Sequence, residues 1–467
     1  MWRLKSRGRF RVHCRLFERT ALRISKSGVA KQLKSLPATA PPRKIKTVNS
    51  TRFMLIAGEA SGDLLAAELV KALEQSPEVE AMPFPPEFFG AGGPKMAEAG
   101  VELAVDLTQH SVIGLFDALK KYHEFKRIFD QLFQLALEHA PDVIICVDFS
   151  GFNHRFANAI KNYVRARAAS FLNWNPKIVQ YVSPQVWASR PGRAYQLARD
   201  VDLLLSIFPF EKDWYAARVP QLRVEFVGHP MVDRYANAER VAPDVRGRNT
   251  PIAATPENQA RLLTSAATVL LLPGSRVAEL RRHLPLMTAT ARKIREAKPE
   301  TRFKMVLPSE ELKRLADEPS AFLTDLEIRI GGLAEALAAA DLAITKSGTI
   351  TLECAYFGVP AVVFYKTSWP SYLAGRMAVG VEHLAMPNLL AGEAIYPEFI
   401  QHAATPDRIA RAALDLLNNS ERRNAVKAKL AQVIKSLGAP GASERAARAV
   451  LRLFDREPVP IRAALAD

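Results

Sequence analysis

From residue 53 onward, short apolar runs alternate with turn residues and with stretches of helical spacing. The runs are FMLIA, DVIICVDF, KIVQYVS, DLLLSIF and VEFVG, followed by TVLLLPGS, RFKMVLP, LAIT and PAVVFY. Continuous apolar runs of this length between helices are typical of parallel strands buried on both faces. The alternation stops once, at residues 237–266, where Pro, Asn, Thr and charged residues replace it. The pattern predicts an α/β protein with two Rossmann-like domains.

We expect five segments along the chain. Residues 1–50 form a basic leader without fixed structure, 51–236 a first domain, 237–266 a linker or insertion, 267–445 a second domain, and 446–467 a C-terminal tail. A chain of 467 residues with 48% hydrophobic residues can form two sizeable cores.

The basic charge of the chain is concentrated in the leader. The formal net charge is +16, yet residues 1–50 hold 14 Lys and Arg against one acid, Glu18, and the other residues hold 50 basic and 47 acidic groups. A body this close to neutral argues against nucleic-acid binding. The Arg-rich leader has the composition of an organelle transit peptide, and a basic tail or a start codon assigned too far upstream explains it equally well.

Two further classes are disfavoured by the sequence. Three cysteines (Cys14, Cys146 and Cys354) are too few and too scattered for a disulfide framework or a zinc site, so we expect a protein of a reducing compartment. No apolar run approaches the ~18 residues of a membrane span.

The turns after the first-half strands carry carboxylates. In GEASGD (residues 58–63), Ser61 and Asp63 suit a helix cap, whereas Glu59 has no capping role and suits hydrogen bonds from sugar hydroxyls. Asp148 directly follows the run VIICV, where a partly buried carboxylate has a raised pKa and suits a general base. Asp148 as the cap of the following helix remains an alternative.

Two turns in the second half suit phosphate binding. Ser275 and Arg276 end the run LLLPGSR before a helix, which offers backbone amides and a guanidinium to an anion. The turn Ser347-Gly348-Thr349 opens another helix and suits a diphosphate, with Glu353 one turn later as an acceptor for a ribose diol. Glu353 as an exposed helix residue is the plain alternative.

Together the motifs GEASGD, GAGGPKM, VDFSGFN, YVSPQVWASR, FPFEK, VGHP, LLPGSR, KSGTITLE and MPNLLAG resemble those of lipid-A-disaccharide synthase. The resemblance follows the same order from about residue 53 to about 440. It implies a GT-B fold, in which two Rossmann-like domains face a cleft. It also implies a hexosyltransferase that joins UDP-2,3-diacylglucosamine to 2,3-diacylglucosamine 1-phosphate, giving a β-1,6-linked disaccharide and UDP in lipid A biosynthesis.

The resemblance also implies residue roles. It makes Asp148 the general base or the residue that orients the acceptor, places Arg276 at the diphosphate and Asn388 near the nucleotide sugar, and requires no metal or cofactor. The chain departs from the family at Gly151, where a second aspartate is common, and at Ser189, where Trp is common before Arg190. These departures concern the acceptor side.

Both implied substrates carry acyl chains, so we expect contact with a membrane surface. The start of the stretch SVIGLFDALKKYHEFKR has more apolar residues than a core-facing stripe needs, and cations follow, as in interfacial helices on anionic lipid. The residues predicted to enter the membrane are Val112, Ile113, Leu115, Phe116 and Leu119. Ordinary packing against the sheet is the alternative. We expect a cytoplasmic protein bound peripherally to the inner membrane, or an organelle protein if the leader is a transit peptide. Besides the substrates, a second copy of the chain in a homodimer is a candidate partner.

Other functions remain open on the residues alone. A MurG-like transferase or a UDP-N-acetylglucosamine 2-epimerase would use the same fold, although an epimerase needs several acidic and His groups around the sugar and the second half offers few His residues. A non-catalytic nucleotide-sugar sensor docked on membranes would keep the nucleotide turns without needing Asp148.

Overall fold

The computed structural model describes residues 50–108, 122–167, 174–241, 266–320, 326–369, 372 and 380–454. The predicted leader (residues 1–50, apart from Ser50) and the membrane-contact residues Val112, Ile113, Leu115, Phe116 and Leu119 lie outside these ranges, as does most of the predicted linker. None of the described helices is both long and apolar enough to cross a membrane.

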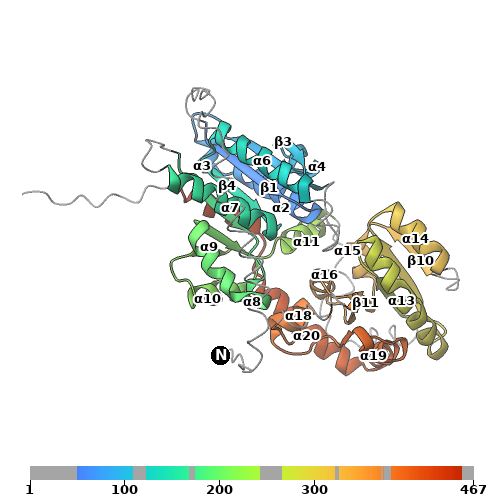
Figure 1. Ribbon diagram of the computed structural model, residues 1–467. Coiled ribbons are helices and arrows are strands. Elements are labelled where there is room, and N and C mark those ends of the chain that lie inside the picture. The colour runs from blue at the N-terminus through green and yellow to red at the C-terminus, as the bar shows by residue number, and fades with distance from the viewer. Residues whose placement is uncertain are drawn as a thin grey trace, which may run out of the picture. The chain divides into compact units, whose positions relative to one another are not determined.

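The first half of the chain forms a seven-stranded parallel sheet of order β3-β2-β1-β4-β5-β6-β7. Figure 1 labels its strands β1, β3 and β4. Its strands are β1 (Arg52–Ala57), β2 (Glu87–Gly92), β3 (Glu102–Asp106), β4 (Val143–Val147), β5 (Lys177–Tyr181), β6 (Leu203–Ser206) and β7 (Arg223–Phe226). Strands β1 and β4 are buried along nearly their whole length because helices cover both faces of the sheet.

The side chains of β1 divide between the two faces in strict alternation. Phe53 and Leu55 belong to one core, and Met54 and Ile56 to the other. The helices of this half are α2 (Ala60–Glu74), α3 (Pro77–Glu80), α4 (Pro94–Glu98), α6 (Tyr122–His139), α7 (Ser150–Ala166), α8 (Val186–Ser189), α9 (Ala194–Asp200), α10 (Pro209–Ala216) and α11 (Pro230–Val241). Helix α2 lines the first core, and α6 and α7 line the second.

The second half forms a six-stranded parallel sheet of order β10-β9-β8-β11-β12-β13. Its strands are β8 (Thr268–Leu272), β9 (Arg302–Leu307), β10 (Leu326–Ile330), β11 (Leu342–Lys346), β12 (Ala361–Tyr365) and β13 (Glu398–Ile400). Its helices are α13 (Val277–Ala297), α14 (Glu310–Ser320), α15 (Leu333–Ala338), α16 (Ile350–Tyr356), α18 (Met386–Ala391), α19 (Pro406–Asn418) and α20 (Ser420–Ser436). One core cluster joins the strands to α13, α16, α19 and α20.

The last helix, α21 (Ala442–Leu451), belongs to the core of the first sheet. Its residues Ala446, Val450 and Leu451 are buried there, and Asp233 of α11 accepts hydrogen bonds from the first backbone amides of α21. Residues 446–451, apart from the exposed Arg448, therefore belong to this core, although they were predicted to begin a tail. The predicted linker also begins later, because α11 continues to Val241.

Candidate active site

The predicted turns lie where the strand order of each sheet reverses. In the first sheet β1 and β4 are neighbours, and the strands numbered between them lie beyond β1. In the second sheet β8 and β11 are neighbours in the same way. The carboxyl ends of such strand pairs are the ligand-binding positions of open α/β sheets. GEASGD and Asp148 share the first position, and PGSR and KSGT share the second.

The first two turns pack directly on each other. A Cβ atom added to Gly58 would lie 2.3 Å from the ring of Phe149, so only glycine lets the turn after β1 approach the turn after β4. Asn153 is fully buried and its amide donates to the carbonyls of Ile56, Val147 and Asp148. These contacts fix the carboxyl ends of β1 and β4 relative to each other.

Asp148 has an uncommon backbone conformation. Its φ is 46° and that of Phe149 is 40°, both in the left-handed region, before α7 begins at Ser150. Asp148 is therefore not the cap of α7, because Phe149 occupies that position. Non-glycine residues held in this region often lie at functional sites. Burial, and then the negative charge of Glu59, raise the pKa of Asp148, which makes the carboxylate a better proton acceptor.

Asp63 has a structural role that differs from the predicted one. Its side chain is buried and accepts hydrogen bonds from the backbone amides of Gly93, Lys95 and Met96, at 2.8–3.0 Å. It thus caps the neighbouring helix α4 on the same face of the sheet, which leaves little of the carboxylate for a substrate. Ser61 is exposed within the first turn of α2, which begins at Ala60, so Ser61 is not the cap of that helix either.

Glu59 links the two predicted positions. Arg276 Nη2 donates to Glu59 Oε2 at 3.3 Å, and the two side chains are about half exposed. The turn after β1 and the turn after β8 therefore meet through one ion pair. An exposed pair of this kind contributes little stability, so it can exchange for a ligand.

The turns of the second sheet bring cations together. Lys346 is the last residue of β11, Arg276 precedes α13, and both contact Glu279 (Lys346 Nζ at 3.0 Å, Arg276 Nη1 at 4.0 Å). Ser275 and Thr349 are exposed beside them. Lys346 was not predicted as a site residue, although a lysine directly before the SGT turn is a signal in the sequence that could have identified it.

Two predicted residues of this region have their polar groups engaged within the fold. The hydroxyl of Ser347 donates to the carbonyl of Leu384 at 2.7 Å. Asn388 is fully buried; its Nδ2 donates to Glu398 and to the Tyr396 carbonyl, and its Oδ1 accepts from two backbone amides. A direct contact between the Asn388 side chain and a nucleotide would break one of these bonds, so the arrangement favours a structural role for Asn388.

Glu353 is mostly buried in the first turn of α16, where the sequence left an exposed position as the alternative. Tyr235 of α11 donates its hydroxyl to Glu353 Oε2 at 2.8 Å, and burial raises the pKa of Glu353. The second carboxylate oxygen, Oε1, has no hydrogen bond among those described. Tyr235 was not predicted, because nothing in the sequence connects α11 with a helix more than 100 residues later.

The first half contains a buried carboxyl group, Glu211, that contacts helix α8. Glu211, in the first turn of α10, is fully buried and accepts hydrogen bonds from Ser206 Oγ at 2.7 Å and from Trp187 Nε1 at 2.9 Å. Burial raises its pKa from 4.5 to about 7, against the opposing effect of its hydrogen-bond donors. The bond to Trp187 ties the motif PQVWASR to FPFEK.

The free energy of unfolding should depend on pH through Glu211. Because its folded pKa lies above the unfolded value, the folded state binds more protons between pH 4.5 and about 7, and stability falls as pH rises through this window. We expect Glu211→Gln to remove this pH dependence. The difference in unfolding free energy between variant and wild type should then change by up to about 3 kcal/mol between pH 4 and pH 8. Urea denaturation at several pH values measures it, and parallel curves for the two proteins would contradict it.

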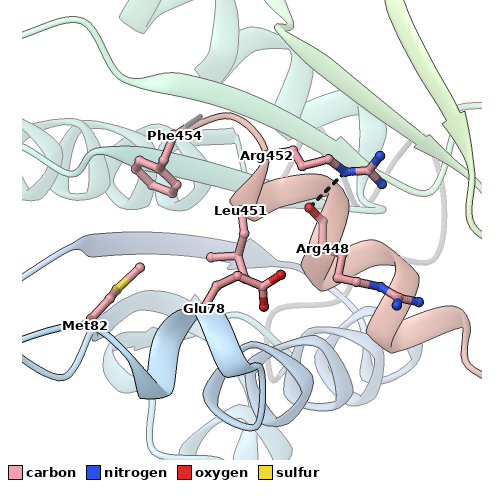
Figure 2. A pocket seen from close by; sticks show the side chains of 6 residues that line it. All are labelled: Glu78, Met82, Arg448, Leu451, Arg452 and Phe454. Carbon is pink, nitrogen blue, oxygen red and sulfur yellow. Dashed lines mark hydrogen bonds between the residues drawn. The ribbon is translucent and has the colours of Figure 1, made fainter. Parts of the chain in front are cut away.

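A surface cavity of about 420 Å³ lies elsewhere (Figure 2). It is lined by Glu78, Met82, Arg448, Leu451, Arg452 and Phe454. Phe454 contacts Phe53, near the amino end of β1, with the ring centroids 6.0 Å apart. The cavity is thus at the end of β1 opposite GEASGD, and it is not part of the candidate active site.

Among the described residues, no group of three or more His, Cys, Asp or Glu side chains is placed to hold a metal ion. The four turns instead combine a partly buried carboxylate on one sheet with paired cations on the other. That combination suits a proton acceptor beside a site for a charged leaving group.

Comparison with known proteins shows the family to which the chain is similar. Residues 53–453 match the family model of lipid-A-disaccharide synthetase. The chain is 36% identical over 415 residues to a lipid-A-disaccharide synthase of Geobacter sulfurreducens, covering 87% of this chain and 98% of that protein. It is 38% identical over 407 residues to one of Anaeromyxobacter dehalogenans, covering 86% and 97%.

Solved structures with little sequence similarity share the fold. A UDP-GlcNAc 2-epimerase of Neisseria meningitidis bound to UDP-GlcNAc aligns with a TM-score of 0.55 at 10% identity, covering 86% of this chain and 100% of that one. The calicheamicin glycosyltransferase CalG4 aligns with a TM-score of 0.51 at 14% identity, covering 88% and 100%. At such identities the alignment establishes the two-domain α/β fold alone.

Proposed function

The chain belongs to the lipid-A-disaccharide synthetase family and is a glycosyltransferase of lipid A biosynthesis, and we propose how its two sheets divide the reaction. In this proposal the first sheet activates the acceptor sugar and the second holds the UDP part of the donor. The donor is UDP-2,3-diacylglucosamine and the acceptor 2,3-diacylglucosamine 1-phosphate. The observation that carries the proposal is the placement of the carboxylate turns and the cation turns at the two strand-order reversals.

Asp148 acts as the general base on the acceptor. Its carboxylate takes the proton of the 6-hydroxyl while the acceptor oxygen attacks C1 of the donor sugar, and the C1–O bond to the diphosphate breaks with its electron pair going to UDP. The raised pKa of Asp148 supports this role, because the acceptor oxygen must lose its proton near neutral pH. Glu59 lies close enough to raise the pKa of Asp148. Once Arg276 leaves Glu59 to bind the donor diphosphate, the Glu59 carboxylate can accept hydrogen bonds from sugar hydroxyls.

Arg276 and Lys346 neutralise the charge that develops on the departing UDP. Both lie at the carboxyl ends of neighbouring strands, Arg276 in the turn after β8 and Lys346 as the last residue of β11. The exposed Ser275 and the Gly348-Thr349 turn lie beside them. Fixed cations aimed at a leaving diphosphate lower the barrier most in a partly enclosed site. Glu353, positioned by Tyr235, is assigned to the ribose diol.

The experiment is an incubation of the purified protein with both acylated substrates, followed by mass spectrometry. We expect the disaccharide 1-phosphate and UDP in equal amounts. UDP-N-acetylglucosamine offered in place of the acylated donor is the matched control: its conversion to a transfer product or a 2-epimer would favour a MurG-like transferase or an epimerase. Binding of UDP without any product would favour a nucleotide-sugar sensor.

The acylated substrates also call for contact with a membrane, which we assign to Val112, Ile113, Leu115, Phe116 and Leu119 from the sequence alone. An apolar cluster followed by Lys120, Lys121, Lys126 and Arg127 suits an anionic lipid surface. On this proposal the enzyme works as a peripheral protein of the cytoplasmic face of the inner membrane. A homodimer is proposed as a further assembly of this chain, and light scattering on the purified protein tests it.

Replacing Ile113, Phe116 and Leu119 together by Ser should release the protein from vesicles that contain anionic lipid. Each inserted side chain contributes roughly 1.5–3 kcal/mol, more than the neighbouring lysines supply at physiological salt. Co-sedimentation measures binding, and activity on detergent-dispersed substrate should survive. Phe84→Ser, which removes an exposed aromatic side chain elsewhere, is the control. A triple variant that melts at lower temperature yet still sediments with vesicles would end the membrane assignment.

A further inference from the structure

Glu279 contacts the same hydrogen-bond donors that the proposed function assigns to the diphosphate. It lies in the first turn of α13, three residues after Arg276. Its Oε1 accepts a hydrogen bond from Lys346 Nζ at 3.0 Å, and its Oε2 accepts one from the backbone amide of Ser275 at 3.3 Å. Arg276 Nη1 lies 4.0 Å from Oε1. One carboxylate thus contacts an ammonium, a guanidinium and a turn amide together.

The backbone around Glu279 is shaped to admit it. Gly274 has φ 127°, and a Cβ atom added there would lie 2.4 Å from Glu279 Oε2 and 2.9 Å from its Cβ. Gly348 on the neighbouring turn has φ 142°, with Lys346 Nζ 3.5 Å from the position of an added Cβ. A glycine at 274 is required both by its backbone conformation and by the close approach of the carboxylate.

The negative charge of Glu279 makes it compete with a bound diphosphate for the same cations. The Glu279 and Lys346 side chains are about four-fifths buried, so solvent screens the pair only in part. A phosphate bound to the Ser275 amide, Lys346 and Arg276 would bring like charge within contact distance of Glu279. The Ser275 amide has a single N–H, so Glu279 and a phosphate cannot both accept from it. The repulsion between the two anions at Lys346 and Arg276 adds to this competition, so the binding of one moves the other.

We propose that Glu279 is an internal anion that holds the diphosphate-binding groups when no nucleotide is bound and that is displaced when the diphosphate binds. The inference rests on the proposed function, because the same groups are assigned to the donor. Glu279 keeps Lys346 and Arg276 paired and oriented between turnovers. When UDP is the product, the return of Glu279 to these groups weakens UDP binding and promotes its release.

The test compares Glu279→Gln with wild type by calorimetric titration of UDP. Glutamine keeps the shape and one acceptor oxygen but removes the competing charge, so we expect UDP to bind about fivefold more tightly, with a matching decrease in its product-inhibition constant. Glu296→Gln is the matched control, since Glu296 is an exposed glutamate at the other end of the same helix. It should bind UDP as wild type does.

Two other measurements distinguish a folding defect, a failure of the Glu279 inference and a failure of the proposed diphosphate site. Thermal melting in the absence of UDP shows whether Glu279→Gln is folded, and a folded variant that binds UDP equally or more weakly overturns the inference. Arg276→Ala tests the proposed function independently. If Arg276→Ala weakens UDP binding while Glu279→Gln does not strengthen it, only the role of Glu279 fails; if Arg276→Ala leaves UDP binding unchanged, the diphosphate site itself is misplaced.

Discussion

Asp148→Asn is expected to lower kcat by about 10²-fold to 10⁴-fold, the range that a positioned general base contributes. Asparagine has nearly the same shape as aspartate but cannot accept the proton of the acceptor hydroxyl. It also tolerates the left-handed backbone conformation that Asp148 adopts. The variant should therefore fold normally and lose only the catalytic step.

The control for Asp148→Asn is its thermal melt, which should match that of wild type within a few degrees. The pH profile gives a second check. Since the pKa of Asp148 is raised, kcat/KM of wild type should fall as pH decreases through that raised value. Near-normal turnover by a folded Asp148→Asn protein would show that another group accepts the proton.

Arg276→Ala is expected to reduce kcat/KM for the donor by about 10²-fold to 10³-fold, as the loss of one charge-stabilising group does in other enzymes. The guanidinium neutralises negative charge on UDP as the bond to C1 breaks. Removal also leaves Glu59 without its partner, but exposed ion pairs contribute little stability, so the fold should persist.

Arg276→Lys is the matched variant for this prediction. It keeps the positive charge but loses the two-pronged geometry of the guanidinium, so it should recover part of the lost activity. Donor KM and kcat measured for both variants separate binding from chemistry. Unchanged values in Arg276→Ala would remove Arg276 from the diphosphate site.

Much of the fold follows from the sequence because buried parallel strands are continuous apolar runs. Runs such as FMLIA and DVIICVDF coincide with β1 and β4. Four strands had no such signal. In β2, glycines interrupt the sequence EFFGAG. The edge strand β3 has only three apolar residues between two acids, and the edge strand β10 alternates apolar with charged residues. Strand β13 has only three residues.

The polar turns could be found from the sequence, but the partners within them could not. The apolar run before Asp148 predicts its place at a strand end, yet the capping of α4 by Asp63 depends on a contact 30 residues away. The sequence suggested that Asp63 caps its own helix, α2, because local spacing carries no information on contacts between helices far apart in the chain. Glu279 and Lys346 were missed for the same reason, since the two residues are 67 positions apart.

The C-terminal helix illustrates a further limit. Residues 446–451 have an apolar pattern that suits any core, and nothing local tells which of the two sheets they join. The structure places them in the first core, where Asp233 fixes the start of α21. Such a return of the chain depends on pairing over more than 200 residues.

The division of work between the two sheets is the central claim, and the dissociation constant of UDP measured on Asp148→Asn tests it most directly. Calorimetric titration should give the wild-type value within a factor of about two, on the same preparation whose kcat has fallen by about 10²-fold or more. That result would place the chemistry on the first sheet and nucleotide binding on the second. If Asp148→Asn instead weakened UDP binding as strongly as Arg276→Ala does, Asp148 would belong to the nucleotide site and the proposed division would be contradicted.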